Sequence, residues 1–174
     1  GEAMLIDAGE NDQGTNVQSY LEEQGIKSLK YMIGTHPDSD HIGGMDVILY
    51  KFDCETVIMP DEAKNTATYR DVIDVMKNKR YTNTLPVVGN SYTLGDAEFT
   101  ILSPGKSYDN SNNNSVVIIL THGENRFLLT GDAQEPAEKD ILACGIPINA
   151  DVYKAGHHGS STSSSDEFLK AIQP

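Results

Sequence analysis

The sequence predicts an α/β domain built in layers, and three features of the chain indicate this fold class. In the first part, short apolar runs typical of strands alternate with segments whose apolar residues recur at helical spacing. The middle contains hairpins instead of strict βαβ alternation, and the last part returns to strands followed by helices. With 174 residues and 38% hydrophobic content, the chain is long enough for one sizeable core and too short for two comfortable domains. We therefore expect a single domain over residues 1–174.

The individual elements follow from apolar periodicity together with turn and capping signals. Thr15-Asn16-Val17-Gln18 has the spacing of a capping box, and Gly25 is a stop signal for the helix that follows. Gly95-Asp96 is a hairpin turn, and Ser164-Ser165-Asp166-Glu167 is a capping box for the last helix. In chain order, the sequence predicts a strand at 4–7, a helix at about 16–24, a strand at 29–33, a helix over 42–49, a strand at 56–59, a helix over 69–76, strands at 85–88, 91–94, 98–102, 116–121 and 126–130, a helix from 136, a strand at 150–154 and a final helix.

Four residues of metal-ligating type fall within six positions directly after the third of these elements. They are His36, Asp38, Asp40 and His41, and Gly43-Gly44 follows them. Imidazole and carboxylate are ligands for hard or borderline divalent cations, and a loop leaving a strand can turn alternate side chains toward one point. Two adjacent pairs would serve two neighbouring metals, with the glycines letting the backbone pass close beneath. The competing interpretation is a solvated acidic loop with two chance histidines, which the ligand density disfavours.

Three more candidate ligands lie at other strand ends. His157 and His158 follow the strand at 150–154, and Asp132 directly follows an apolar strand in a Thr-Gly-Asp sequence. Asp132 has an alternative structural role as the N-cap of the helix that begins near Pro136. Its placement after a buried strand favours metal ligation. The remaining histidine, His122, is expected in a turn between two strands.

These motifs resemble those of the metallo-β-lactamase superfamily. The patterns are H-x-D-x-D-H-x-G-G from His36, T-G-D ending at Asp132 and G-H-H-G-S around His157. The resemblance covers almost the whole chain and is closest to the hydrolase domain attached to the DNA-uptake channel proteins ComEC/Rec2 and to free-standing relatives of that domain. Asp7 resembles the aspartate of the turn that opens the motif series, and is expected to orient loop groups near the metals. Asn112–Ser115 is similar to the Asn-Ser element of this branch.

The resemblance implies a metallo-β-lactamase-like αββα sandwich with metals at one edge of two facing sheets. Compared with that template, the chain lacks strands before Gly1 and after Pro174. We therefore expect a sandwich truncated at both ends, which a partner chain or an oligomer would complete.

Within this resemblance, the donors suffice for two divalent ions. His36 and Asp38 would bind one ion, Asp40, His41 and one of His157 or His158 the other, and Asp132 would bridge them. Which of the two adjacent histidines is the ligand stays open. A bridging water would become a hydroxide nucleophile, and the second histidine would protonate the leaving group.

The expected catalytic residues are therefore Asp40, His157 and His158. By position in the resemblance, Asn114 and Ser115 are expected to contact substrate, together with the hydroxyl of Ser160.

Two departures from the family pattern bear on the metal. Asp38 stands where the superfamily usually has a second histidine, and no histidine lies between His41 and His122. A carboxylate makes the site harder, so manganese competes with zinc as the expected ion.

The leading functional hypothesis is a dinuclear metal-dependent hydrolase that cleaves a phosphodiester, a nuclease of the ComEC/Rec2-like competence type. One alternative is a lactone, ester or amide hydrolase that uses the same hydroxide with a different pocket lining. Another is a non-catalytic module that binds metal only for structure, which the missing mid-chain histidine favours and the intact motifs oppose.

The charge of the chain bears on its substrate. The net charge is −13, and the densest basic group is only Lys77, Lys79 and Arg80. Because nonspecific nucleic-acid affinity comes mainly from lysine and arginine, this acidity disfavours DNA and favours a smaller ester, with both substrates kept open.

Cysteine usage and hydropathy leave the compartment open. Cys54 and Cys144 form no C-x-x-C pair, and the longest apolar run, Val116–Leu120, is far short of the roughly 18 to 20 residues that cross a bilayer. An extracytoplasmic protein and a soluble domain of a membrane-associated protein both remain consistent with the sequence.

Overall fold

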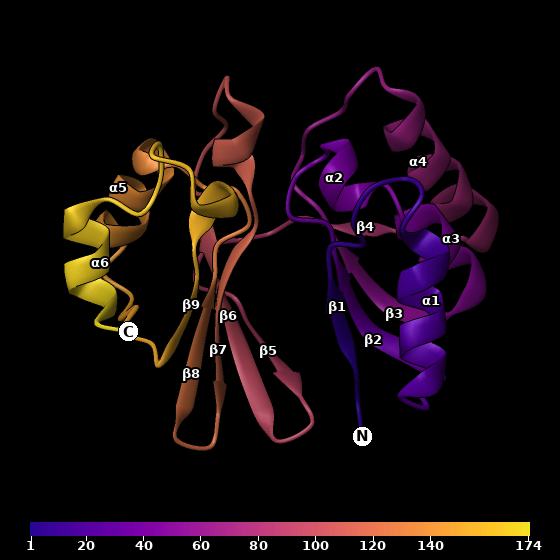
Figure 1. Cartoon of the computed structure of the whole chain (residues 1–174), viewed down its shortest axis with the longest axis horizontal. Helices are drawn as coiled ribbons and strands as arrows, with labels where there is room; N and C mark the ends of the chain where they lie inside the picture. The colour runs from indigo at the N-terminus through magenta and orange to yellow at the C-terminus, as the bar shows by residue number, and fades with distance from the viewer. The chain divides into compact units, whose positions relative to one another are not determined.

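The computed structural model describes residues 1–174 and divides them into two compact units, Gly1–Leu85 and Pro86–Pro174. We call them unit 1 and unit 2. Each unit has its own sheet, with helices on one face of it (Figure 1). The single-domain organisation expected from chain length stays a prediction.

Unit 1 is a parallel α/β unit. Its sheet has the order β1 (Met4–Ile6), β2 (Ser28–Ile33), β3 (Asp53–Ile58) and β4 (Asn83–Thr84), and all neighbouring strands are parallel. Helices α1 (Gly14–Glu23), α2 (Ser39–Ile42), α3 (Met45–Lys51) and α4 (Ala67–Lys79) connect the strands. Parallel strands end at the same edge of a sheet, so the segments that follow β1, β2 and β3 gather there. Those segments begin at residues 7, 34 and 59.

The core of unit 1 lies between its sheet and helices α1, α3 and α4, which cover one face of the sheet in Figure 1. Met32 of β2, Ile48 of α3 and Val72 of α4 are completely buried. Removing a side chain of this size from water contributes roughly 1.5–3 kcal/mol, so such contacts hold the helices in fixed positions on the sheet.

Unit 2 combines an antiparallel meander with one parallel crossover. Its sheet has the order β5 (Ser91–Leu94), β6 (Ala97–Ser103), β7 (Val117–His122), β8 (Asn125–Leu129) and β9 (Val152–Lys154). Strand β8 pairs with β9 in parallel through helix α5 (Glu135–Ala143), and α6 (Asp166–Ile172) closes the unit. Two short 3-10 helices, η1 (Ser111–Asn114) and η2 (Gly156–Gly159), lie before β7 and after β9.

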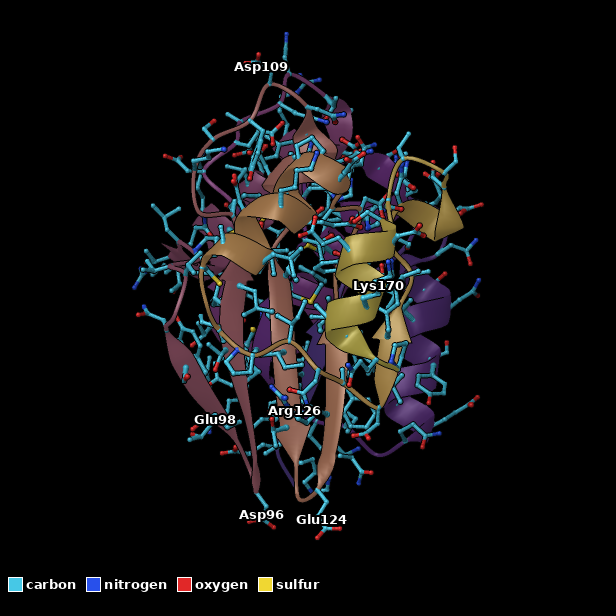
Figure 2. All side chains as sticks on the ribbon, turned by 90° about the vertical axis from the view of Figure 1, so that its left-hand side faces the viewer. Asp96, Glu98, Asp109, Glu124, Arg126 and Lys170 are labelled. Carbon is cyan, nitrogen blue, oxygen red and sulfur yellow. The ribbon has the colours of Figure 1, made fainter.

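This topology separates two ends of unit 2. Because β8 and β9 are parallel, the segments after Leu129 and Lys154 emerge at the same sheet edge. The β5–β6 and β7–β8 turns lie at the other end, where Figure 2 shows Asp96 and Glu124 at the hairpin tips. His122 is the last residue of β7, next to the turn in which it was expected.

Three local predictions are wrong. The capping box at Thr15 is not formed, since α1 begins at Gly14 after Gln13 and has no side-chain cap. The helix predicted over 42–49 is divided at Gly43-Gly44, where the N–H of Gly44 donates to the carbonyl of Gly9, and a Cβ on Gly44 would lie 2.5 Å from the carbonyl oxygen of Ala8. The strand predicted at 85–88 is absent; Pro86 has no N–H for a ladder, and only Asn83–Thr84 pairs with β3.

The last helix is capped one residue later than predicted. Ser165 is the N-cap, and its side chain accepts a hydrogen bond from the N–H of Phe168. Ser164 instead has a left-handed backbone, with φ at 61°. No helix in the structure has both the length and the apolar character needed to cross a bilayer.

Candidate metal centre

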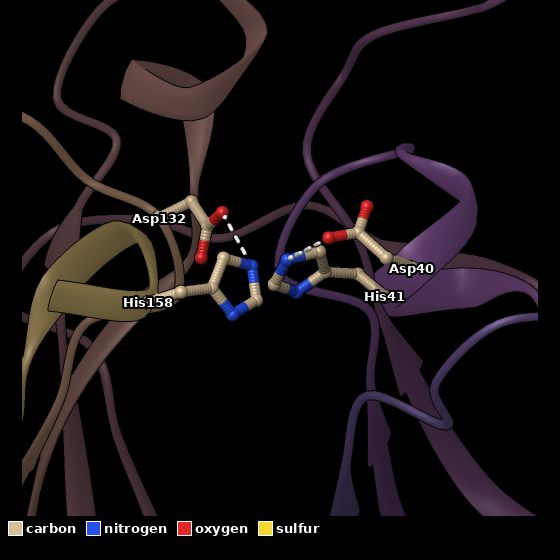
Figure 3. Close-up of side chains that lie close together, drawn as sticks. All are labelled: Asp40, His41, Asp132 and His158. Atoms are coloured by element: carbon tan, nitrogen blue, oxygen red, sulfur yellow. Dashed lines mark ion pairs between the residues drawn. The ribbon is translucent and has the colours of Figure 1, made fainter. Parts of the chain in front are cut away.

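In unit 1, Asp7 fixes the orientation of His41. Asp7 directly follows β1, and its Oδ2 lies 2.6 Å from Nδ1 of His41. This contact directs the other ring nitrogen, Nε2, to a point 3.5 Å from Oδ2 of Asp40 (Figure 3). A histidine that donates from Nδ1 to a carboxylate presents Nε2 as a metal ligand, and the carboxylate raises its basicity.

Thr35 links Asp7 to a second histidine, His36. Its N–H and hydroxyl both donate to the carboxylate of Asp7, each at 2.8 Å. The hydroxyl oxygen also lies 3.2 Å from Nδ1 of His36, so this histidine too can donate from Nδ1 and present Nε2. That Nε2 is 3.6 Å from Oδ2 of Asp38. Both histidines are buried, and their ring centroids are 4.2 Å apart.

Asp38 has a second partner that the sequence did not indicate. The ammonium of Lys64, in the loop between β3 and α4, donates a hydrogen bond to Oδ1 of Asp38. This loop reaches Asp38 because β2 and β3 are parallel in register, with Ile33 opposite Ile58. Unit 1 therefore presents two acid–histidine pairs, and one of them already holds a cationic side chain.

In unit 2, the parallel crossover brings Asp132 and His158 together. Nε2 of His158 lies 3.2 Å from Oδ2 of Asp132 (Figure 3). The hydroxyl oxygen of Ser115, between η1 and β7, accepts a 3.0 Å hydrogen bond from the N–H of Asp132. Lys154 donates to the carbonyl of Gly131 at 2.9 Å, and its ammonium is 4.0 Å from Oδ1 of Asp132. Asp132 is not a helix cap, because the N-cap of α5 is Gln134.

His157 has different surroundings from its neighbour. Its ring nitrogens lie 3.3 Å from the side-chain amide nitrogen of Asn112, 3.1 Å from that of Gln134 and 3.2 Å from the hydroxyl of Thr162. Both histidines have left-handed backbones, with φ at 45° for His157 and 53° for His158. This conformation turns the two adjacent rings apart, with centroids 6.1 Å apart. Of the two histidines, His158 is the one whose ring nitrogen contacts the carboxylate of Asp132.

The residues expected to contact substrate are held within unit 2. The side-chain amide of Asn114 accepts from the N–H of Tyr108 and donates to its carbonyl, at 2.8 and 2.9 Å. The hydroxyl of Ser160 lies 3.0 Å from that of Thr162, and Ser115 is completely buried. Their contact with substrate stays a prediction.

The loop that carries Asn114 is tied to α5. The hydroxyl of Tyr108 donates to Oδ2 of Asp140 at 2.5 Å, and Lys106 pairs with the same carboxylate. The hydrogen bonds from Lys106 and then from Tyr108 hold the pKa of Asp140 below its ordinary value, whereas burial and Asp140 raise the pKa of Tyr108. The polar loop over residues 103–114 is therefore anchored to α5 through Tyr108 and Lys106.

The donors present fit a divalent cation. Asp40 with His41, and separately Asp132 with His158, each offer a carboxylate oxygen and an imidazole nitrogen within 4.8 Å of one another. All these donors are nitrogen or oxygen, a set that suits zinc and manganese.

A family model described as "Metallo-beta-lactamase superfamily" matches residues 1–174. The chain belongs to the metallo-beta-lactamase superfamily. Its members are mostly metal-dependent hydrolases, and their fold binds divalent metals, usually zinc. The superfamily fold and the candidate ligands of this chain therefore both indicate metal binding.

Curated superfamily relatives include proteins of the predicted branch. The chain is 31% identical over 164 residues to "ComE operon protein 3" of Bacillus subtilis, covering 89% of this chain and 20% of that protein. It is 32% identical over 180 residues to "Recombination protein 2" of Haemophilus influenzae, covering 100% of this chain and 21% of that protein. The chain thus spans about a fifth of the length of these relatives, and the predicted resemblance is confirmed.

Solved structures confirm the predicted metallo-β-lactamase fold class. A subclass B3 metallo-beta-lactamase from a soil metagenome library matches with a TM-score of 0.58 at 15% identity, covering 90% of this chain and 69% of that one. A metallo-beta-lactamase from Hirschia baltica matches with a TM-score of 0.53 at 18% identity, covering 99% and 80%. At these identities, the likeness concerns the fold alone.

Sequence reasoning missed the lysines at this superfamily site. Lys64 and Lys154 each lie beside a candidate acidic ligand, Asp38 and Asp132 respectively. Lys154 had a usable signal, since it ends the strand that leads to the histidine pair. Lys64 had none, because a single lysine in a polar loop resembles ordinary surface.

Proposed function

We propose that the chain is a metal-dependent hydrolase that cleaves phosphodiesters, of the ComEC/Rec2-like type. The observation that carries this proposal is the Asp7–His41 contact at 2.6 Å, which holds an imidazole as metal ligands are held, beside a carboxylate. The acid–histidine pairs offer only oxygen and nitrogen donors, whereas structural zinc sites are usually built with cysteine thiolates. The names of two relatives, "Recombination protein 2" of Haemophilus influenzae and the 25% identical "Competence protein ComA" of Neisseria gonorrhoeae, support a nucleic-acid-linked substrate class.

The proposed ligands follow the donor count from the sequence. By that count, His36 and Asp38 would hold one ion, Asp40, His41 and His158 would hold another, and Asp132 would be available to both. A bound divalent cation would neutralise negative charge on the phosphoryl group and lower the pKa of a water ligand. The protein's part is to hold these donors: Asp7 and Thr35 orient the histidines, and Ser115 and Lys154 fix the turn that carries Asp132.

His157 is proposed as a proton donor or a positioning residue rather than a ligand. Its ring contacts join η1, the start of α5 and the segment after η2. It would therefore hold the polar loop over residues 103–114 in place beside the segment that carries His158.

The net charge of −13 sets the expected preference among phosphodiesters. An acidic chain would repel a long polyanion more than a small diester, because the longer substrate carries more negative charge. We expect a small diester or a short single strand to be cleaved more readily than duplex DNA.

The test compares manganese- or zinc-dependent cleavage of single-stranded DNA and of a small phosphodiester. Asp132→Ala should abolish cleavage of both, whereas Asp96→Ala, which removes the same charge at a hairpin tip, should leave cleavage unchanged. Undiminished cleavage by Asp132→Ala would overturn the proposal. Turnover of lactones or other esters without diester cleavage would instead establish the alternative hydrolase.

A further inference from the structure

The ion pair between Lys64 and Asp38 lies at the sheet edge where the candidate ligands of unit 1 gather. Lys64 follows β3, and Asp38 follows β2, so the parallel pairing of the two strands places both segments at one edge. Each oxygen of the Asp38 carboxylate has a nitrogen of another side chain nearby. Its Oδ1 accepts from the Lys64 ammonium, and its Oδ2 lies 3.6 Å from Nε2 of His36.

The backbone position of Asp38 would ordinarily give its side chain another partner. Asp38 is the N-cap of α2, a place where an aspartate usually accepts a hydrogen bond from an N–H of the first helical turn. The side chain makes no such bond. It is directed to Lys64 and His36, so the local helix is not the reason for an aspartate at this position.

The surroundings also distinguish this ion pair from surface pairs in the same unit. The side chains of Lys64 and Asp38 are 26% and 33% exposed, and the neighbouring His36 is buried. In the Lys79–Asp53 pair, at 3.4 Å, the aspartate is 91% exposed. A partly desolvated ammonium interacts more strongly with nearby charge than an exposed one, because less water screens it.

We propose that Lys64 is the resident cation of the His36–Asp38 pair. It neutralises Asp38 and competes with a divalent ion for the carboxylate, so this pair takes up metal weakly and only by displacing the ammonium. The Asp40–His41 pair, whose imidazole Asp7 orients through Nδ1, then belongs to the tightly held ion. This inference rests on the proposed metal-dependent function and deepens it, because it makes the two ion sites unequal.

A metal titration tests this inference without measuring turnover. Chelator-treated protein is titrated with manganese, and the ions retained after gel filtration are counted. Wild-type protein should retain one ion per chain, with a second site at least about tenfold weaker. Lys64→Gln should strengthen the second site about tenfold or more, so that two ions are retained.

Three variants locate the effect. Lys79→Gln makes the same charge change at the exposed pair and should titrate like wild type. Lys64→Arg keeps the positive charge and should also resemble wild type. Asp38→Asn combined with Lys64→Gln should lose the second ion again, which would place that ion at Asp38. Thermal unfolding of each variant, within a few degrees of wild type, would show that the fold is retained.

The outcomes separate this inference from the proposed function. Equal affinity for two ions in wild type, or identical titrations of wild type and Lys64→Gln, would overturn the role of Lys64. A gain of the second ion in Lys64→Gln, with no diester cleavage by any loaded form, would support the inference and overturn the phosphodiesterase proposal.

Discussion

Oδ2 of Asp7 lies 2.6 Å from Nδ1 of His41, across 34 residues of sequence. The contact depends on the ends of β1 and β2 meeting at one sheet edge, since Asp7 follows the first strand and α2, which carries His41, follows the second. Asp7 also has a left-handed backbone, with φ at 60°. Backbone strain of this kind is concentrated at functional sites.

Asp7→Asn should weaken metal binding about 10- to 100-fold. Asparagine tolerates the left-handed backbone, so the substitution removes the charge and keeps the conformation. Its amide cannot accept from Thr35 and His41 as the carboxylate does, and the free energy of unfolding should fall by about 1–3 kcal/mol. Metal titration and urea denaturation measure the two effects. Asp74→Asn, an exposed aspartate on α4, is the matched control, and equal behaviour of the two variants would contradict this role for Asp7.

Comparison of His158→Ala with His157→Ala should show which of the two histidines is a metal ligand and which one stabilises the surrounding segments. Because the ring of His158 lies on Asp132 while that of His157 contacts Asn112, Gln134 and Thr162, only His158→Ala should lower metal affinity by about tenfold or more. His157→Ala should change metal affinity little and destabilise unit 2 through lost polar contacts. The reverse order of metal affinities would assign the ligand to His157.

Glu138→Gln should destabilise the chain by about 2–4 kcal/mol. Glu138 on α5 is buried, and its two carboxylate oxygens accept from the N–H groups of Ser164 and Ser165, at 2.5 and 3.0 Å. The substituted amide would place a donor against one of these N–H groups. Urea denaturation measures the loss. Glu135→Gln, on the exposed side of the same helix, should cost less than about 0.5 kcal/mol, and similar losses for both variants would contradict the capping role.

The two cysteines should differ sharply in reactivity. Burial raises the pKa of the Cys54 thiol to about 11, and its Sγ donates to the carbonyl of Thr56, whereas Cys144 is exposed. Since the thiolate is the reactive form, a thiol reagent at pH 8 should modify one cysteine per native chain and two in denaturant. Cys144→Ser should leave no fast-reacting thiol. Rapid modification of that variant in its native state would contradict the burial of Cys54.

Much of the fold could be predicted because periodicity and turn residues are local signals. The residues that form β2, α4, the β6–β7–β8 strands and α5 carry such signals, and the observed bounds differ by only a few positions. Of the failures, one depends on a distant contact and another on a local residue that outweighs apolar content. Gly44 interrupts a periodic helix because Ala8 packs against it, and Pro86 prevents a strand that apolar content favoured.

The candidate site shows the same limit. Its acid and histidine residues could be found from their density and from their places at strand ends. Their individual contacts could not be predicted, because two adjacent histidines differ only through a left-handed backbone at each. Lys64 reaches Asp38 through the register of parallel strands, a relationship that no local pattern encodes.

The most direct test of the central claim is manganese-dependent hydrolysis of bis(p-nitrophenyl) phosphate by wild type and by Asp132→Ala. We predict turnover by wild type that is lost on chelation, restored by manganese and absent in Asp132→Ala. Turnover that survives chelation, or that is equal in the two proteins, would contradict the proposal that these residues form a metal-dependent phosphodiesterase site.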